Sequence, residues 1–134
     1  MLPTGVDRLG TSTPGCNGGL AVGVLAMPRV GATRFAMTST NGPGSSQGLL
    51  LVSGASLAQP ILVGGAEVWV APASLLAILP VVSDSVGYCE VALPIPADPL
   101  LTGLTVYSQF LWPKACAPNT ASSTAALQIV VQSP

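Results

Sequence analysis

The sequence YCEVALPI, residues 88–95, alternates strictly between two kinds of side chain. Its odd-numbered positions, from Cys89 to Ile95, are apolar, whereas the even-numbered positions include Tyr88 and Glu90. Side chains at every second position share one face of an extended strand, so this segment predicts a half-buried β-strand.

Two later segments extend the same argument toward the end of the chain. AALQIVVQ, residues 125–132, also repeats with a period of two. LTVYSQFLW, residues 104–112, is apolar on both faces, as is typical of a strand that is central in a sheet or covered by a partner.

Between these segments the chain is built from short apolar runs separated by turn residues. Its 13 prolines and 15 glycines leave no window for a long amphipathic helix. The sequence therefore predicts an all-β fold, an antiparallel two-sheet sandwich, immunoglobulin-like or jelly-roll-like, of about seven to nine strands. Further strands are predicted at residues 20–26, 33–40, 48–53, 67–71 and 74–79, with a short piece at 60–63.

The domain organisation follows from where this pattern begins. Residues 1–18 are rich in Gly, Pro, Thr and Ser, and they predict an extended N-terminal arm outside the core. Residues 19–134 predict one β-sandwich domain. Residues 1–15 lack the apolar centre of a signal peptide, so the sequence predicts a chain that is already mature or exported by another route.

Composition excludes two classes of partner. Hydrophobic residues make up 49% of the 134 residues, but the best apolar window, residues 68–82, is too short to span a bilayer and contains Pro72 and Pro80. The four cations and a net charge of −1 provide no basic patch, so the sequence predicts no nucleic-acid partner.

The three cysteines predict one disulfide and one free thiol. Cys16 and Cys116 lie in loops flanking the predicted sandwich, which favours their pairing, whereas Cys89 lies on an apolar strand face. A Cys89–Cys116 bond is the close alternative. The absence of histidine and of C-x-x-C spacing argues against a zinc site, and we expect no metal or other cofactor.

No motif in the sequence supports catalysis. GSSQG, residues 44–48, matches the pattern of a nucleophile elbow, but the chain has no histidine base and no following helix. The carboxylates are scattered; Glu67 and Glu90 are a candidate cross-strand pair without support from their spacing. Asp84 and Asp98 are predicted to cap turns. The sequence predicts no catalytic residue and a protein that is not an enzyme.

The scarce aromatic residues divide into two groups. Trp69 and Trp112 are expected in the core, because aromatic residues are only 4% of the chain and a core uses the largest rings first. Tyr88 and Tyr107 are the candidates for exposed contacts with a glycan or another partner.

Several motifs resemble one uncharacterised β-sandwich domain, found often at the C-terminal end of large secreted proteins of planctomycete-type bacteria. The residues that carry the resemblance are Gly15-Cys16, PRVG at 28–31, LLLV at 49–52, LPIPADPLLTGL at 93–104, YSQF at 107–110 and LQIVV at 127–131. The resemblance implies a secreted, non-catalytic sandwich. The chain departs from the family where Gly65-Ala66 replaces a usual Gly-Cys, which removes the usual partner of Cys16, and where Trp112-Pro113-Lys114-Ala115-Cys116 replaces a usual Asp-Pro-Gly.

The function predicted from these observations is a structural or assembly module in an extracellular fibre, surface layer, matrix or larger complex. Charged residues are only 7% of the chain, so much of its surface must be uncharged, and edge strands have few charges to block pairing. We expect protein partners, including copies of the same chain reached by the arm at residues 1–18. A secreted carbohydrate-binding module is the alternative.

Overall fold

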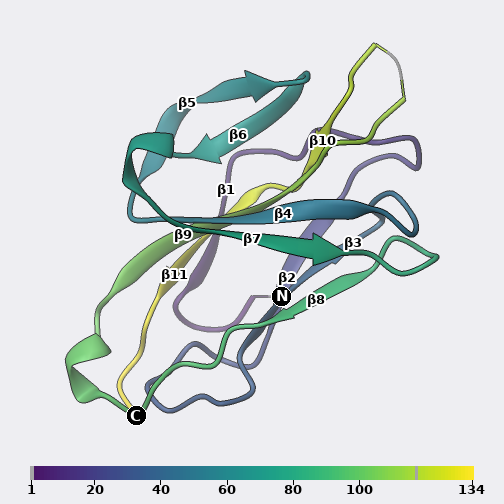
Figure 1. Ribbon diagram of the computed structural model, residues 1–134. Coiled ribbons are helices and arrows are strands. Elements are labelled where there is room, and N and C mark those ends of the chain that lie inside the picture. The colour runs from purple at the N-terminus through teal and green to yellow at the C-terminus, as the bar shows by residue number, and fades with distance from the viewer. Residues whose placement is uncertain (1, 117) are drawn as a thin grey trace.

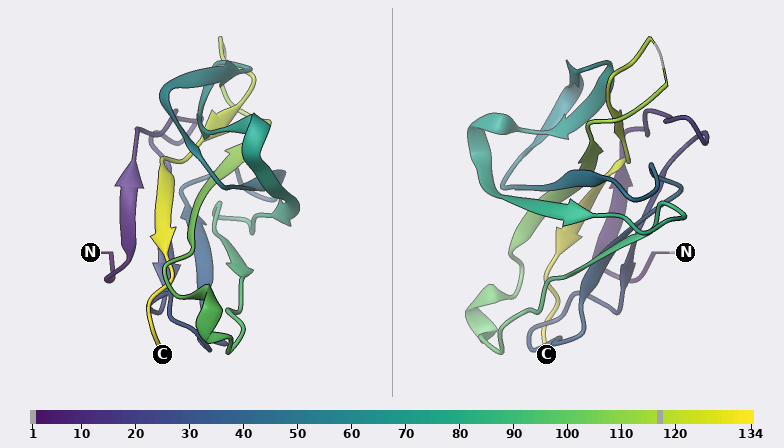
Figure 2. Two further views of the ribbon diagram at one scale, coloured as in Figure 1. Left: turned by 90° about the vertical axis from the view of Figure 1, so that its left-hand side faces the viewer. Right: turned by 45° about the vertical axis from the view of Figure 1, so that its right-hand side comes forward.

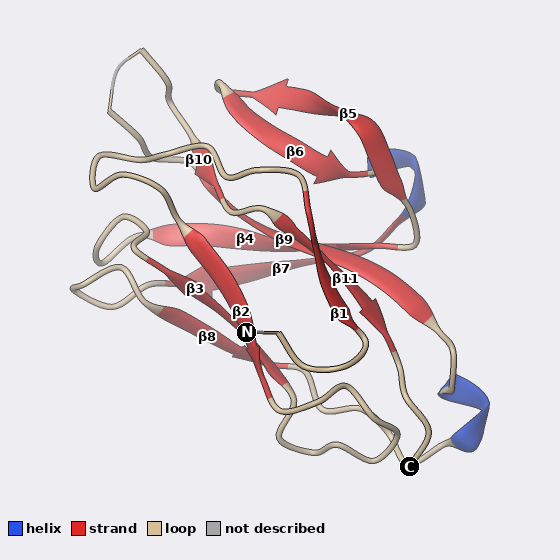
Figure 3. Cartoon of the chain, turned by 180° about the vertical axis from the view of Figure 1, so that it is seen from behind, coloured by secondary structure: helices blue, strands red, loops and turns tan. Residues whose placement is uncertain are grey.

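The computed structural model describes residues 2–116 and 118–134, and its strands form three antiparallel sheets (Figure 1). One sheet has six strands, one has three, and one is a two-stranded hairpin. The all-β, sandwich-like fold predicted from the alternating segments is confirmed. Among the described residues, helix is limited to two 3-10 turns of three residues each, η1 (Pro72–Ser74) and η2 (Pro99–Leu101), both in connections between strands (Figure 3).

The six-stranded sheet is the centre of the molecule. Its path runs from β1 (Val6–Leu9) through β11 (Ala126–Val130), β9 (Thr105–Trp112) and β4 (Gln47–Ser53) to β7 (Leu75–Val82). The short β10 (Ser122–Ser123) pairs with the end of β9. β9 has partners on both sides, because Ser108 pairs with Val52 of β4 and with Leu127 of β11.

The three-stranded sheet covers one face of this central sheet. It consists of β2 (Ala21–Leu25), β3 (Ala36–Thr40) and β8 (Cys89–Ala92). β8 is shorter than the predicted segment 88–95, because Pro94 has no N–H to continue a ladder. The interior between the two sheets is apolar, and its largest fully buried members are Trp112, Phe110, Met37, Leu50 and Leu127.

A hairpin of β5 (Ser56–Val63) and β6 (Ala66–Val70) covers part of the opposite face of the central sheet (Figure 1). It closes a second apolar cluster that includes Val68, Val70, Leu51 and Leu111. The central strand β9 therefore contributes side chains to two separate cores. This arrangement explains why its sequence is apolar on both faces.

The N-terminal segment differs from the prediction of an arm outside the core. The segment is extended, but β1 pairs with β11 of the same chain from Val6↔Ile129 to Leu9↔Ala126 (Figure 2). The side chain of Val6 is only 4% exposed and belongs to the core between the sheets. Further along, Thr13 forms an antiparallel bridge with Ser123. The sequence pattern missed this strand because it has four residues, too few to show periodicity.

Within the described residues, the structure contains no helix that is both long and apolar enough to cross a bilayer.

Candidate functional sites

The disulfide joins Cys16 to Cys116, with 5.0 Å between their Cα atoms. The predicted pairing is confirmed, and the alternative bond between Cys89 and Cys116 is wrong. Cys89 is a free thiol, 3% exposed, on the face of β8 that contacts the main core. Burial among apolar side chains raises the pKa of this thiol above its ordinary value. Cys89 is therefore a packing residue in a protonated state.

The structure does not bring the two candidate tyrosines together. Tyr88 precedes β8 in the three-stranded sheet, and its hydroxyl donates to Glu90 Oε1 at 2.8 Å. This hydrogen bond is the main reason why the pKa of Tyr88 is raised. Tyr107 lies in β9 and packs against the cluster under the hairpin. Because these locations are on opposite sides of the central sheet, the tyrosines do not form one stacking surface.

The two tryptophans differ in burial, and only Trp112 lies fully in the core as predicted. Trp112 is fully buried, as predicted, and its Nε1 donates to Ser39 Oγ at 3.2 Å. Trp69 is half-buried on β6, and its Nε1 donates to the carbonyl oxygen of Thr11 at 3.0 Å. Gly10 lies against the Trp69 ring so closely that a Cβ atom there would collide with it. Trp69 therefore holds the N-terminal segment against the hairpin.

The candidate catalytic pair of carboxylates is not formed. Glu67 is in β6, where its Oε1 accepts a hydrogen bond from Thr11 Oγ1 at 2.8 Å. Glu90 is in β8, opposite Thr38 of β3. The two residues are in different sheets and are not cross-strand neighbours. Among the described residues, no group of three or more His, Cys, Asp or Glu side chains has the arrangement to hold a metal ion.

Other polar residues singled out by the sequence have local structural roles. Ser46, in the GSSQG segment, lies in the connection that leads into β4 and donates from Oγ to the carbonyl oxygen of Gly44 at 2.9 Å. Asp84 Oδ1 accepts from the amides of Val86 and Tyr88, as predicted for a turn cap. Asp98 Oδ1 accepts from the amide of Leu100 and caps η2.

A buried polar group that the sequence did not indicate joins the hairpin to the central sheet. Gln109, in β9, is 0% exposed. Its Nε2 donates to the carbonyl oxygens of Glu67 and Thr124, each at 2.7 Å, and its Oε1 accepts from the amide of Trp69 at 2.8 Å. The only sequence signal was a long polar side chain within a strand that is largely apolar on both faces. Such fully satisfied groups specify how two elements pack.

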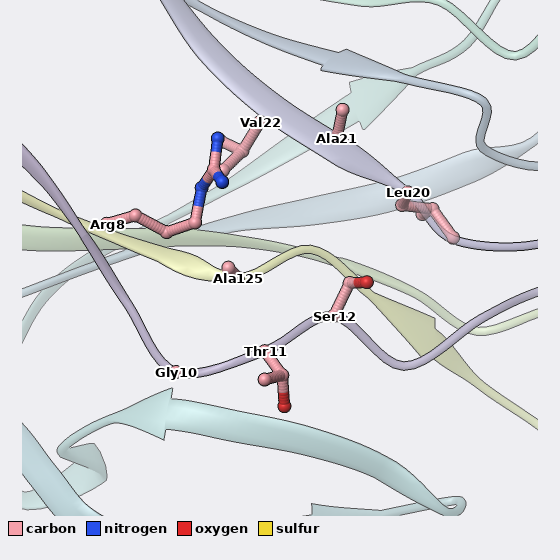
Figure 4. A pocket seen from close by; sticks show the side chains of 8 residues that line it. All are labelled: Arg8, Gly10, Thr11, Ser12, Leu20, Ala21, Val22 and Ala125. Atoms are coloured by element: carbon pink, nitrogen blue, oxygen red, sulfur yellow. The ribbon is translucent and has the colours of Figure 1, made fainter. Parts of the chain in front are cut away.

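A pocket of about 330 Å³ opens between β1 and β2 (Figure 4). Arg8 extends along one side of it toward Val22, whereas the Thr11 hydroxyl points away, toward Glu67. The pocket therefore combines one guanidinium group with the hydroxyl of Ser12 and an apolar floor that includes Leu20. This is a sparse set of polar groups for the recognition of a small molecule.

The two edges of the central sheet differ in chemistry. At one edge, β1 has four residues, including the exposed and charged Asp7 and Arg8. At the other edge, β7 has eight residues, LLAILPVV, with no charge. Its exposed side chains are apolar, and Leu76 is 64%, Ile78 52% and Val82 67% exposed. Charged and short edge strands resist pairing with another chain, whereas long apolar edges invite it.

Comparison of this chain with protein-family models, with curated proteins and with solved structures finds no match.

Proposed function

We propose that this chain is a non-catalytic structural module that assembles with copies of itself outside the cell. The observation that carries the proposal is the β7 edge, an eight-residue strand without charge at the end of the central sheet. A second strand added there would gain main-chain hydrogen bonds on either side of Pro80, which has no N–H to donate. It would also cover the apolar side chains of Leu76, Ile78 and Val82.

The surface as a whole supports the same proposal. The chain has only nine charged residues, 4 basic and 5 acidic. Long-range repulsion between copies is therefore weak, and close association costs little electrostatic free energy. Association through β7 replaces the expectation that residues 1–18 reach a neighbouring subunit, because β1 is already paired with β11 of its own chain.

Two further features agree with a secreted protein. Disulfides between cysteines form and persist mainly in oxidising compartments, and Cys16–Cys116 is such a bond. The resemblance to secreted sandwich domains of planctomycete-type bacteria points the same way. The alternative of a carbohydrate-binding module has less support, since Tyr88 and Tyr107 lie on opposite sides of the central sheet.

The test is the association of the purified chain, measured by sedimentation velocity over a wide range of concentrations. We expect concentration-dependent oligomers, and we expect Ile78→Lys to weaken association about thirtyfold or more, as for a central interface residue worth at least about 2 kcal/mol. Lysine at this position adds a charge to the edge, while its aliphatic stem retains contact with the sheet.

The matched control is Val86→Lys, which places the same charge at an apolar residue that is 75% exposed in the turn before β8. This variant should associate like the wild type. A chain that stays monomeric at all concentrations, or an Ile78→Lys variant that associates normally, would overturn the proposal.

A further inference from the structure

A cavity of about 310 Å³ lies between the two sheets, at the end of the sandwich near η2. Its inner wall is formed by Phe35, Ser108 and Ile129, all of which are buried. Its outer wall includes Leu104, which is 48% exposed, and the exposed Pro96. The cavity therefore runs from the main core to the surface, and Leu104 and Pro96 mark its mouth.

The single polar side chain that lines the cavity belongs to Ser108. This residue is 1% exposed, and its Oγ has no hydrogen-bond partner among the described residues. In the central sheet Ser108 lies between Val52 and Leu127, both of which direct aliphatic side chains into the same core region. A buried hydroxyl without a partner is unfavourable and rare in folded proteins, so this one requires an explanation.

Backbone hydrogen bonds help to hold the wall opposite Ser108 in place. The amide of Leu93 donates to the carbonyl oxygen of Phe35 at 2.9 Å, and the amide of Ile95 donates to that of Ala32 at 3.0 Å. The intervening Pro94 has a fixed φ angle and no amide hydrogen. These restraints keep the segment extended, so it cannot easily move inward and fill the cavity.

We propose that this cavity is a binding site for a small, neutral, mainly apolar molecule with one oxygen atom, such as an alcohol or a ketone. The hydroxyl of Ser108 would hydrogen-bond to that oxygen, and the aliphatic walls would cover the rest. An apolar cavity of about 150 Å³ accepts a benzene molecule, so a cavity twice as large accommodates about twelve non-hydrogen atoms.

The charge of the ligand follows from the lining. Every described residue that lines the cavity is uncharged. A carboxylate or an ammonium group beside Ser108 would lose its hydration without gaining an opposite charge. The free-energy cost of this desolvation is much larger than the cost for a neutral oxygen atom. The site therefore selects the neutral molecule over its charged analogue.

The probe for this proposal is 1-octanol, with octanoate as the charged analogue of equal chain length. We expect the amides of Ser108, Ile129 and Val131 to shift in NMR spectra of the full chain on titration with 1-octanol, with saturation, and octanoate to bind at least about tenfold more weakly. Ser108→Ala should weaken the binding of 1-octanol about fivefold, the effect of one neutral hydrogen bond.

The melting temperature distinguishes a ligand-binding role of Ser108 from a structural role. Ser108→Ala should retain or raise the melting temperature, because it removes a buried hydroxyl that has no partner. The matched control is Ser39→Ala, since Ser39 is equally buried but bonds to Trp112 and does not line the cavity. This control should lower the melting temperature and leave the affinity for 1-octanol unchanged. Leu104→Trp, at the exposed mouth, should fold normally and block binding.

The proposal is wrong if the wild type shows no saturable shifts with 1-octanol. It is also wrong if octanoate binds equally well, or if Ser108→Ala binds 1-octanol like the wild type. These outcomes are independent of self-association, because none of the exposed β7 side chains lines this cavity.

Discussion

Trp112 is the largest side chain in the interior, and Gly48 leaves room for its ring. Its ring lies parallel to that of Phe110, with 6.4 Å between the ring centroids, and its Nε1 bonds to Ser39. Gly48 faces the ring from the adjacent strand β4, and a Cβ atom there would collide with it. The sequence predicted a buried Trp112 from the scarcity of aromatic residues, but the requirement for Gly48 appears only in the packed structure.

Gly48→Ala should therefore destabilise the fold by about 1–3 kcal/mol, the usual cost of overfilling a packed core. The free energy of unfolding in urea measures this effect. The control is Gly54→Ala, where the nearest non-neighbouring atom to a new Cβ is the carbonyl oxygen of Ser74 at 3.8 Å. That variant should stay within about 0.5 kcal/mol of the wild type. Equal stability of the two variants would contradict the prediction.

Cys89 links the stability of the fold to alkaline pH. Its pKa is raised above the ordinary value, first by burial and further by Asp84, against a lowering hydrogen bond from the backbone of Val82. A thiol with a raised pKa in the folded state contributes stability that is fully present below its unfolded pKa. This contribution is lost as the pH rises through the folded pKa.

The free energy of unfolding, measured in urea, should consequently fall between pH 8 and pH 11. This range is set by the ordinary pKa values, near 8.5 for Cys and 10 for Tyr. Cys89→Ala should reduce this fall. A smaller fall should remain in the variant, because the pKa of Tyr88 is also raised, chiefly by its hydrogen bond to Glu90. The double variant with Tyr88→Phe should flatten the profile further. A Cys89→Ala profile parallel to that of the wild type would exclude this role for the thiol.

At the scale of the elements, two of the predicted segments match strands almost to their ends. Residues 104–112 correspond to β9 (Thr105–Trp112), and residues 48–53 to β4 (Gln47–Ser53). Errors occur where a strand is too short for periodicity, as in β1, and where a proline interrupts a ladder, as after β8. Only the end of β5 (Ser56–Val63) was predicted, as a short piece at 60–63. These features depend on partners distant in the sequence, such as Ile129 for Val6.

The contact between the hairpin and the central sheet is the element-level feature that depends most on one residue. Gln109 satisfies two carbonyl groups and one amide that lie in β6 or beside β11. Gln109→Ala leaves these groups without their partner, and we expect a loss of about 2–4 kcal/mol in the free energy of unfolding.

Hydrogen exchange provides the specific readout for Gln109→Ala. The amide of Trp69 should exchange much faster in this variant, while amides of β3 should be less affected. Gln128→Ala is the control, since Gln128 is a half-buried glutamine in the adjacent strand β11. It should change neither measurement greatly. Unchanged protection of Trp69 in Gln109→Ala would show that the network does not hold the hairpin.

At the scale of the whole molecule, the sequence indicated two layers, and the structure adds a partial third. The pattern of residues 104–112 showed that something must cover both faces of β9, but it could not show that β5 and β6 provide the second cover. The same holds for the candidate sites. The disulfide was predictable from the positions of Cys16 and Cys116, whereas the cavity at Ser108 arises only when segments distant in the sequence meet.

The disulfide joins cysteines that are 100 residues apart in the sequence. It should stabilise the fold by about 4–5 kcal/mol, because it lowers the entropy of the unfolded chain. The double variant Cys16→Ser/Cys116→Ser should lose this amount, measured by urea unfolding without a reducing agent. Reduction of the wild type should produce the same loss. Addition of a reducing agent to the double variant is the control and should have no effect. A loss below about 1 kcal/mol would contradict this prediction.

The position of the same bond decides how the molecule would respond to a mechanical pull on its two ends. Val6 pairs with Ile129, so both ends leave the β1–β11 pair on the same side, and tension would peel these strands apart one hydrogen bond after another. The tension would then reach the bond between Cys16 and Cys116 and pass across it. The strands from β2 to β9 lie within that covalent ring, and they would bear no load once β11 and β10 had also separated from β9. Such a module would lengthen by a fixed amount and then stop, with most of its fold intact.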